Sequence, residues 1–307
     1  MKFESAIIIR DKTRLEQLIE RFNSKAQAKF YIESSGGDFE YFELEHNTFY
    51  ESLSKIKESI TGNLKHKVIN RSFLPTYIFT EKDLVLVIGQ DGLVANTAKY
   101  VNGLPIIGIN PDIERYDGIL LKHAPSDLNG ILKNVMKGNY ETKEVTMAKA
   151  TLNDGQILLA FNDFYIGADS HVSSRYSIAF NGIKEQQSSN SIIISTGAGS
   201  TGWLSSIFNM TNNVSGYYNS AKNDCGTTLD WNDNKLVFVV REPFLSKMTE
   251  TNIGYGIITK NKTLKIESNM PTNGVIFSDG IESDFLNFNS GSIVEIGIAD
   301  ERANLVV

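Results

Sequence analysis

The sequence lacks the features that mark secreted, membrane-spanning or nucleic-acid-binding proteins. Its 307 residues include one cysteine, Cys225, so an internal disulfide and a zinc site built from thiolates are not expected. The apolar run Ala6–Ile9 is too short for a signal peptide, and no run approaches the ~20 apolar residues of a membrane span. The net charge of −6 argues against general nucleic-acid binding, which needs a basic face. We therefore expect a cytoplasmic protein with no nucleic-acid or membrane partner.

What remains is the composition of an ordinary globular protein. Hydrophobic residues make up 41% of the chain and charged residues 21%, which is enough apolar surface for a real core. A length of 307 residues favours two domains. The four histidines are scattered, and no pair has metal-ligand spacing, so no side chain is assigned to a metal site.

The first half of the chain alternates between strand and helix patterns. Leu84–Ile88 is a continuous apolar run before Gly89, which is typical of a central parallel strand buried on both faces. Pro105–Ile109 is a second apolar run and is also predicted to be a strand. Helical spacing predicts four helices, at Lys12–Phe22, Glu51–Leu64, Gly92–Val101 and Asp127–Met136. Ser126 is the expected N-cap of the last of these helices. We therefore predict a Rossmann-like α/β domain over residues 1–143.

The second half has the pattern of antiparallel strands. Asp154-Gly155 and Asn181-Gly182 each separate two apolar runs, and both dipeptides are strong hairpin signals because they tolerate positive φ. We predict a mostly antiparallel β domain over residues 144–307, with the option that its C-terminal segment returns to the first domain. The polar segment Phe208–Asn234 is interpreted as a surface loop, an insertion rather than a lid.

Gly89-Gln90-Asp91-Gly92 is the first segment that carries chemistry. It follows a buried strand and opens a helix, where ligands of α/β sheets bind and where free N–H groups attract phosphate. An acid repels phosphate, so Asp91 makes sense if it binds Mg²⁺ or accepts a proton from an attacking hydroxyl. The alternative is a tight turn in which Asp91 caps the helix.

The loop from Ser195 to Trp203 is the second such segment. It contains a literal G-x-G-x-x-G at Gly197, Gly199 and Gly202, but no acid ends a following strand ~20 residues on, as a Rossmann dinucleotide turn requires. Its hydroxyls and backbone donors suit phosphate or ribose recognition.

Two shorter segments contain acids next to strands. Asn162-Asp163 interrupts an apolar, aromatic strand, either as a fork for sugar hydroxyls or as a strand-end turn. Asp279-Gly280 closes a strand and by itself indicates only a turn.

In this order, the segments resemble the NAD kinase family of the NAD-kinase and diacylglycerol-kinase-like superfamily. The family's glycine-acid turn corresponds to Gly89–Gly92, its Gly-Ile-Asn element to Gly108-Ile109-Asn110, and its Asn-Glu pair to Asn162-Asp163. Its hydroxyl-rich loop is similar to Ser195–Trp203, in a form that looks like the bacterial and mitochondrial-type subgroup sometimes labelled "sugar kinase". The resemblance spans roughly residues 80–307.

The resemblance implies an α/β domain followed by a β-rich domain and a phosphotransferase with an alcohol group as acceptor. With ATP and Mg²⁺, such an enzyme phosphorylates the adenosine-ribose 2′-hydroxyl of NAD or NADH to give NADP(H). Asp91 would be the catalytic acid-base, and the family forms homodimers or homotetramers. The implied nucleotide-binding residues are Gly89, Gln90, Gly92, Asn110, Asn162, Asp163, Ser195, Thr196, Gly199, Ser200, Thr201, Gly202 and Trp203.

Four departures from the family pattern keep two alternatives open. Gln90 replaces a glycine, and its Cβ disfavours positive φ. Asp163 replaces Glu, Asn190-Ser191 stands where Asp-Gly is usual, and Pro111–Gly118 replaces a glycine-rich sequence. The alternatives are a kinase for another nucleoside or sugar-containing metabolite, and a non-catalytic NAD(P)-binding sensor.

Overall fold

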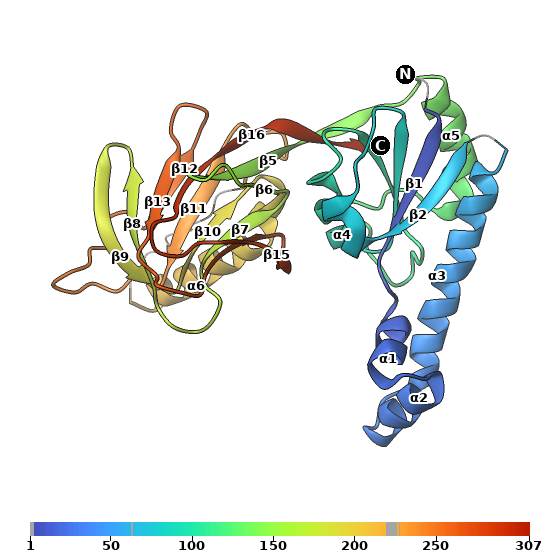
Figure 1. Cartoon of the computed structure of the whole chain (residues 1–307), viewed down its shortest axis with the longest axis horizontal. Coiled ribbons are helices and arrows are strands. Elements are labelled where there is room, and N and C mark those ends of the chain that lie inside the picture. The colour runs from blue at the N-terminus through green and yellow to red at the C-terminus, as the bar shows by residue number, and fades with distance from the viewer. Residues whose placement is uncertain (1–2, 63, 219–225, 227) are drawn as a thin grey trace. The chain divides into compact units, whose positions relative to one another are not determined.

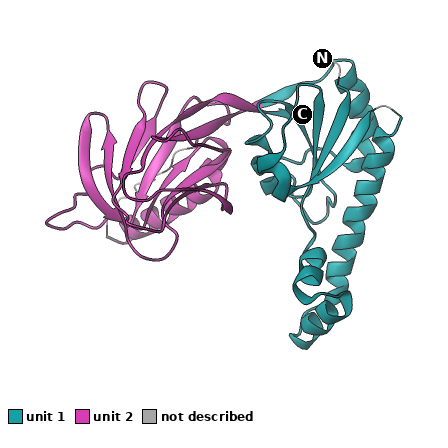
Figure 2. Ribbon diagram, viewed as in Figure 1, with its two compact units in different colours: residues 1–143, 304–307 teal, residues 144–303 magenta. Residues whose placement is uncertain are grey.

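The chain folds into two compact units, shown in Figures 1 and 2. A computed structural model describes residues 3–62, 64–218, 226 and 228–307. Unit 1 comprises Met1–Lys143 and Asn304–Val307, and unit 2 comprises Glu144–Ala303. The first unit is α/β and the second is mostly antiparallel β, so the predicted fold class is confirmed.

Unit 1 is built on a parallel sheet in the order β2-β1-β3-β4. The strands are β1 (Ser5–Arg10), β2 (Lys65–Asn70), β3 (Asp83–Ile88) and β4 (Pro105–Ile109), and the end of β16 (Ile293–Val306) pairs with β4. Every residue of β3 is buried, as its continuous apolar sequence predicts.

Helices cover both faces of this sheet (Figure 1). On one side α3 (Phe39–Ile60) and α5 (Leu128–Met136) pack their apolar residues onto the strands, and on the other α4 (Asp91–Ala98) contacts β3 and β4. A smaller cluster joins α1 (Arg14–Phe22), α2 (Lys25–Ser34) and the start of α3. Two short 3₁₀ helices, η1 (Arg71–Thr76) and η2 (Pro125–Asp127), complete the unit.

Unit 2 is a sandwich of two sheets around one apolar core. One sheet has the order β12-β11-β10-β7-β14-β15, and the other contains β5, β6, β8, β9, β13 and most of β16. The bounds are β5 (Thr142–Leu152), β6 (Ile157–Ala160), β7 (Asp163–Ala168), β8 (Ser174–Phe180), β9 (Ile183–Ser189), β10 (Ser191–Ser195), β11 (Leu236–Arg241), β12 (Tyr255–Ile258), β13 (Leu264–Ser268), β14 (Gly274–Ser278) and β15 (Ile281–Asn287). Both predicted hairpins form, as β5–β6 and β8–β9.

The interpretation of Phe208–Asn234 as a loop is wrong for its first part. After the 3₁₀ turn η3 (Ala198–Thr201), α6 runs over Trp203–Tyr218. Buried Leu204 and Ile207 recur at helical spacing, and Leu204 packs against Val237 of the six-stranded sheet. Ser206, Asn209 and Asn213 are exposed. Residues 219–225 and 227, which include Cys225, lie outside the described residues.

Three predicted helix boundaries also shift. Ser126 does not cap α5, because it lies inside η2 and its hydroxyl donates to the carboxylate of Asp127. The predicted helix Glu51–Leu64 is the last part of α3, which begins at Phe39 after its N-cap Asp38. The helix predicted over Gly92–Val101 is α4, which begins one residue earlier, at Asp91, and already ends at Ala98. No helix in the described part of the chain is long and apolar enough to cross a membrane.

Candidate functional site

The Gly89–Gly92 turn joins the central strand β3 to α4. Gly89 has φ +153°, which side-chain-bearing residues rarely adopt, and a Cβ there would lie 3.2 Å from Leu93. Gln90 is the N-cap of α4 with an extended φ of −115° and an exposed side chain. The turn therefore needs no positive φ at residue 90, and replacing the family glycine by Gln90 causes no backbone strain.

Asp91 is the first residue of α4, and its carboxylate is held by a neighbouring loop. One carboxylate oxygen accepts the backbone N–H of Ile119 at 3.0 Å, and the other accepts the N–H of Leu120 at 2.9 Å. The N-cap position belongs to Gln90, so Asp91 does not cap the helix. Each oxygen retains a second lone pair, so the carboxylate is oriented and still able to accept another donor.

Asn110 shapes the same loop. This buried residue follows β4, and its amide donates to the carbonyl of Tyr116 at 2.9 Å and accepts the N–H of Asp112 at 3.0 Å. Gly118, at φ +63°, packs so closely that a Cβ would lie 2.7 Å from the amide nitrogen. The Asn110 side chain thus supports the loop that orients Asp91.

The carboxyl end of β1 lies beside this turn. Arg10, the last residue of β1, is in register with Ile88 on one side and Asn70 on the other. Because the chain connects β1 to β2 on one side and β3 lies on the other, this is the topological switch point where open α/β sheets bind ligands.

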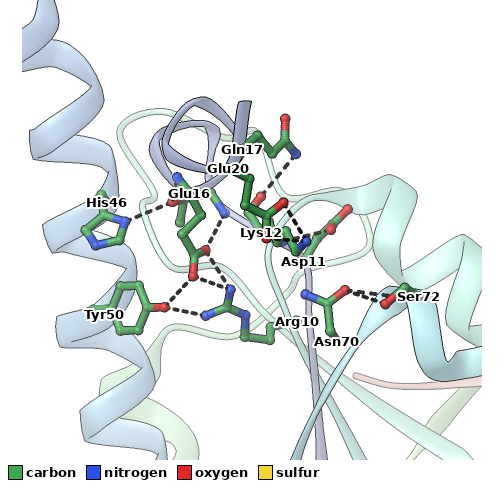
Figure 3. Close-up of polar contacts among 11 residues, drawn as sticks. Arg10, Asp11, Lys12, Glu16, Gln17, Glu20, His46, Tyr50, Asn70 and Ser72 are labelled. Carbon is green, nitrogen blue, oxygen red and sulfur yellow. Dashed lines mark hydrogen bonds and ion pairs between the residues drawn. The ribbon is translucent and has the colours of Figure 1, made fainter. Parts of the chain in front are cut away.

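A polar network surrounds Arg10 (Figure 3). Its guanidinium donates to both oxygens of Glu16 at 2.6 and 2.7 Å and to the hydroxyl of Tyr50 at 2.6 Å. Burial alone would raise the pKa of Glu16, but hydrogen bonds from Arg10, Tyr50 and the backbone of Thr13 lower that pKa to about 2. The charge of Arg10 is therefore neutralised and its side chain fixed.

A cavity of about 550 Å³ opens next to Arg10. Its walls come from β2 and η1 and include Lys67, Asn70, Phe73 and Tyr77. The Lys67 ammonium lies 4.9 Å from the centre of the Tyr77 ring. Sequence reasoning missed this cavity because a lone arginine after an apolar strand, or a phenylalanine between two strands, carries no local signal.

In unit 2, the turn Phe161–Asp163 connects β6 to β7 and is held from two sides. Thr196 donates its hydroxyl to the carbonyl of Phe161 at 2.6 Å and its N–H to the carbonyl of Asn162 at 2.9 Å. The carboxylate of Asp279 accepts the N–H groups of Phe161 at 3.1 Å and Asn162 at 2.6 Å. Asp279, which the sequence marked only as a turn, thus belongs to this site.

The side chains of Asn162 and Asp163 are left without hydrogen-bond partners among the described residues. Asp163 is 9% exposed and lies opposite Ser195 in the sheet. Burial, together with the charge of Asp279, raises the pKa of Asp163 to about 7. A carboxyl group of this kind can both donate and accept hydrogen bonds near neutral pH.

The hydroxyls of Ser195 and Ser200 bind within the Ser195–Trp203 loop itself. Ser195 donates to the carbonyl of Thr196 at 3.1 Å and Ser200 to that of Gly197 at 2.8 Å. Thr196 also accepts the N–H of Gly199 at 3.2 Å. In contrast, Thr201 and Gly202 are exposed.

Two glycines of this loop permit close backbone packing. A Cβ at Gly197 would lie 2.0 Å from the carbonyl oxygen of Asp230, and one at Gly199 would lie 2.2 Å from that of Asn162. The literal G-x-G-x-x-G therefore places the loop against neighbouring backbone, and Gly199 brings it onto the Asn162 turn.

Trp203 ends the loop in an aromatic stack. Its ring lies 6.1 Å from Tyr165, which in turn stacks on Phe277 at 4.6 Å, and both pairs are nearly parallel. The guanidinium of Arg241 lies 5.5 Å from the Trp203 ring. The half-buried Trp203 offers a planar surface on the same sheet face as Asp163 and Ser195.

The structure thus gathers the sequence-predicted residues into two groups. Gly89, Gln90, Asp91, Gly92 and Asn110 form one in unit 1, and Asn162, Asp163, Ser195, Thr196, Gly199, Ser200, Thr201, Gly202 and Trp203 form the other in unit 2. Within the described ranges, no group of three or more His, Cys, Asp or Glu side chains could hold a metal ion on its own.

The fold is that of NAD kinase-type proteins. A yeast NADH kinase complexed with NADH superposes with a TM-score of 0.64 and 11% identity, covering 100% of this chain and 84% of that chain. An NAD kinase from Archaeoglobus fulgidus in complex with ATP superposes with a TM-score of 0.57 and 13% identity, covering 99% and 93%.

Sequence similarity leads to the same group. The NAD kinase of Saccharolobus solfataricus is 26% identical over 152 residues, which are 50% of this chain and 55% of that protein. The NAD kinase of Clostridium kluyveri is 28% identical over 165 residues, or 51% and 56%. The chain spans about half the length of the curated relatives it matches, and no family profile matches it. The chain is therefore similar to NAD kinases in sequence over about half of its length and in fold over nearly all of it.

Proposed function

We propose that this protein transfers the terminal phosphate of ATP to the adenosine-ribose 2′-hydroxyl of NAD or NADH, giving NADP(H). The observation that carries the proposal is the oriented carboxylate of Asp91, at the start of a helix and next to the switch point of a parallel sheet. Phosphoryl transfer needs an aligned hydroxyl and neutralised charge, and little covalent chemistry from the protein. The names of the relatives support the choice of substrate.

Unit 1 is the proposed phosphoryl-donor side. The N-terminus of α4 and the glycines of the Gly89–Gly92 turn present backbone N–H groups to phosphate oxygens. The cavity beside Arg10 offers aromatic and cationic side chains to a nucleotide. Mg²⁺ usually binds through substrate phosphates and one or two carboxylates, and Asp91 would supply the carboxylate here. The same carboxylate orients the acceptor hydroxyl and takes its proton.

Unit 2 is the proposed dinucleotide side. The unpartnered side chains of Asn162 and Asp163 would bind ribose hydroxyls, and Trp203 would stack against a planar base. Thr201 and Gly202 are the exposed residues of the loop and would line the same surface. Ser195, Thr196, Gly199 and Ser200 would act by holding the loop and the Asn162 turn in place.

We also propose a requirement for Mg²⁺, a homodimer or homotetramer, and a cytoplasmic location. Resemblance to the family supports the metal and the assembly, and the single cysteine is in keeping with a reducing compartment. Light scattering coupled to size-exclusion chromatography measures the assembly directly.

The alternative of a non-catalytic sensor is less well supported. Its main argument was that Gln90 would distort the glycine-acid turn, but the extended φ of Gln90 fits that turn without strain. A kinase for another nucleoside or sugar-containing metabolite would keep the same unit 1 chemistry.

The experiment is an assay for NADP(H) formed from NAD or NADH with ATP and Mg²⁺, with the phosphorylated position identified by NMR. We expect phosphate on the adenosine-ribose 2′-oxygen. ATP turnover with a different acceptor would favour the other kinase, and dinucleotide binding without ATP turnover would favour the sensor.

A further inference from the structure

Asp279 reaches a turn that is 117 residues away in the sequence. It lies between β14 and β15, yet its carboxylate accepts the N–H groups of three consecutive residues. The distances are 3.1 Å to Phe161, 2.6 Å to Asn162 and 3.4 Å to Asp163. Its own N–H donates to the carbonyl of Asp163 at 3.0 Å. An internal carboxylate thus occupies the backbone donors of the Asn162–Asp163 turn.

The hairpin turn directs this carboxylate. Asp279 and Gly280 have φ of +55° and +69°, the left-handed pair that a tight two-residue hairpin requires. Aspartate tolerates this conformation better than most residues, and glycine adopts it freely. The side chain of residue 279 is therefore placed over the turn by backbone geometry rather than by a flexible linker.

Thr196 and Gly199 hold the opposite side of the same turn. The hydroxyl and N–H of Thr196 bind the carbonyls of Phe161 and Asn162, and Gly199 packs against the Asn162 carbonyl. The backbone of Asn162 thus has partners for both its N–H and its carbonyl. Its half-buried side-chain amide, by contrast, has no partner among the described residues, so it is fixed in place and available.

We propose that Asp279 is a positioning residue for dinucleotide binding: it holds the Asn162–Asp163 turn so that the Asn162 amide and the Asp163 carboxyl face the hydroxyls of a ribose. The inference rests on the proposed function, because it takes NAD or NADH as the ligand.

The charge of Asp279 has a second effect on the same turn. Burial and then this charge raise the pKa of Asp163, and among the described residues Asp279 is the charged side chain that acts on it. The residue facing Asp163 across the sheet is the uncharged Ser195. Removing the charge at position 279 lowers the pKa of Asp163, so the pH dependence of dinucleotide binding moves to lower pH.

The test measures NAD and NADH binding by calorimetry from pH 5.5 to 8.5, together with kcat and KM, for wild type and Asp279→Asn. We expect roughly tenfold weaker dinucleotide binding and a higher KM, with kcat changed by less than about threefold. We also expect the pH midpoint of binding to fall. A purely structural role would not move that midpoint. Glu282→Gln, an exposed carboxylate on the same hairpin, is the matched control and should behave as wild type.

Gly280→Ala is the second variant and decides the question if Asp279→Asn does not fold. A Cβ at Gly280 meets no atom within 4 Å, so this change acts through the strained φ alone and displaces the carboxylate of Asp279. Roughly threefold weaker binding is expected. The inference is overturned if a folded Asp279→Asn protein binds the dinucleotide with unchanged affinity. If Asp279→Asn does not fold, unchanged affinity of Gly280→Ala overturns it. Either result leaves the proposed function intact. A wild type that binds neither NAD nor NADH overturns the proposed function itself.

Discussion

Asp91 in unit 1 and Asp163 in unit 2 are both acids beside a chain turn, but their surroundings are opposite. The carboxylate of Asp91 accepts two backbone N–H groups from the loop after β4. The carboxyl of Asp163 has no hydrogen-bond partner among the described residues, and burial beside Asp279 raises its pKa to about 7. In unit 2 the backbone N–H groups are bound by Asp279 instead.

The difference suggests a division of work between the two acids. A carboxylate that is oriented by two donors has a fixed direction, which suits alignment of a hydroxyl during phosphoryl transfer. A carboxyl without partners keeps its full hydrogen-bonding capacity for a ligand, at the cost of an unfavourable site in the empty protein.

Asp91→Asn should have the largest effect, because the proposed acid-base group is lost. We expect kcat for NADP(H) formation to fall by about 10²–10⁴. Asparagine retains one of the two N–H interactions, so near-native unfolding behaviour is expected. Glu114→Gln, which changes an exposed acid in the adjoining loop, is the control and should keep its activity. Full activity of Asp91→Asn would remove this residue from the mechanism.

Gly199→Ala should disrupt the unit 2 turn through a steric clash. The added Cβ would lie 2.2 Å from the carbonyl oxygen of Asn162, a backbone atom that cannot easily move. We expect the free energy of unfolding to fall by about 1–3 kcal/mol and the dinucleotide KM to rise. Gly216→Ala in α6 has open space around its Cβ and should not destabilise the protein. Chemical denaturation of both variants makes the comparison, and equal stability would contradict the close packing.

Asp163→Asn should change how stability depends on pH. Because the folded-state pKa of Asp163 is raised to about 7, its contribution to stability is fully present below its unfolded pKa of ~3.9 and is lost as the pH rises through about 7. The variant lacks this loss. Relative to wild type it should therefore gain roughly 2–3 kcal/mol of unfolding free energy between pH 5 and pH 8. Urea unfolding at both pH values measures this difference, and a difference that does not change with pH would show that Asp163 is not a buried, proton-holding acid.

Gln90→Gly should have the smallest effect. The extended φ at residue 90 needs no glycine, and the side chain is exposed. We expect kcat/KM to stay within about threefold of wild type. A tenfold or larger gain in kcat/KM would mean that Gln90 obstructs the turn. The hydrogen bonds around Asp91 would then not be enough to explain how it differs from Asp163.

Much of the fold is predictable because local patterns coincide with the tertiary contacts. The strand β4 has the predicted bounds, and β3 lies within one residue of its prediction, since each is a continuous apolar run. The hairpins at Asp154-Gly155 and Asn181-Gly182 follow from their turn residues. The polar half of α6 was missed because its helical structure depends on Leu204 and Phe208 packing against the sheet.

The site was predictable only where it has a local signature. The Gly89–Gly92 turn is recognisable because glycines and an acid follow a buried strand. The contributions of Arg10 and Asp279 are not, because one depends on strand register and the other on a contact between residues more than 100 positions apart. Asn110 and Thr196, which also position other residues, were found because they belong to segments with a recognisable pattern, whereas Arg10 and Asp279 have no such pattern around them.

The roles of the two acids can be separated by steady-state formation of NADP(H) from ATP and NAD or NADH, measured in parallel for wild type, Asp91→Asn and Asp163→Asn. We expect product from wild type, loss of kcat with little change in KM for Asp91→Asn, and a raised KM with kcat largely kept for Asp163→Asn. No product from a wild type that binds the dinucleotide, or the same kinetic defect in both variants, would contradict these roles.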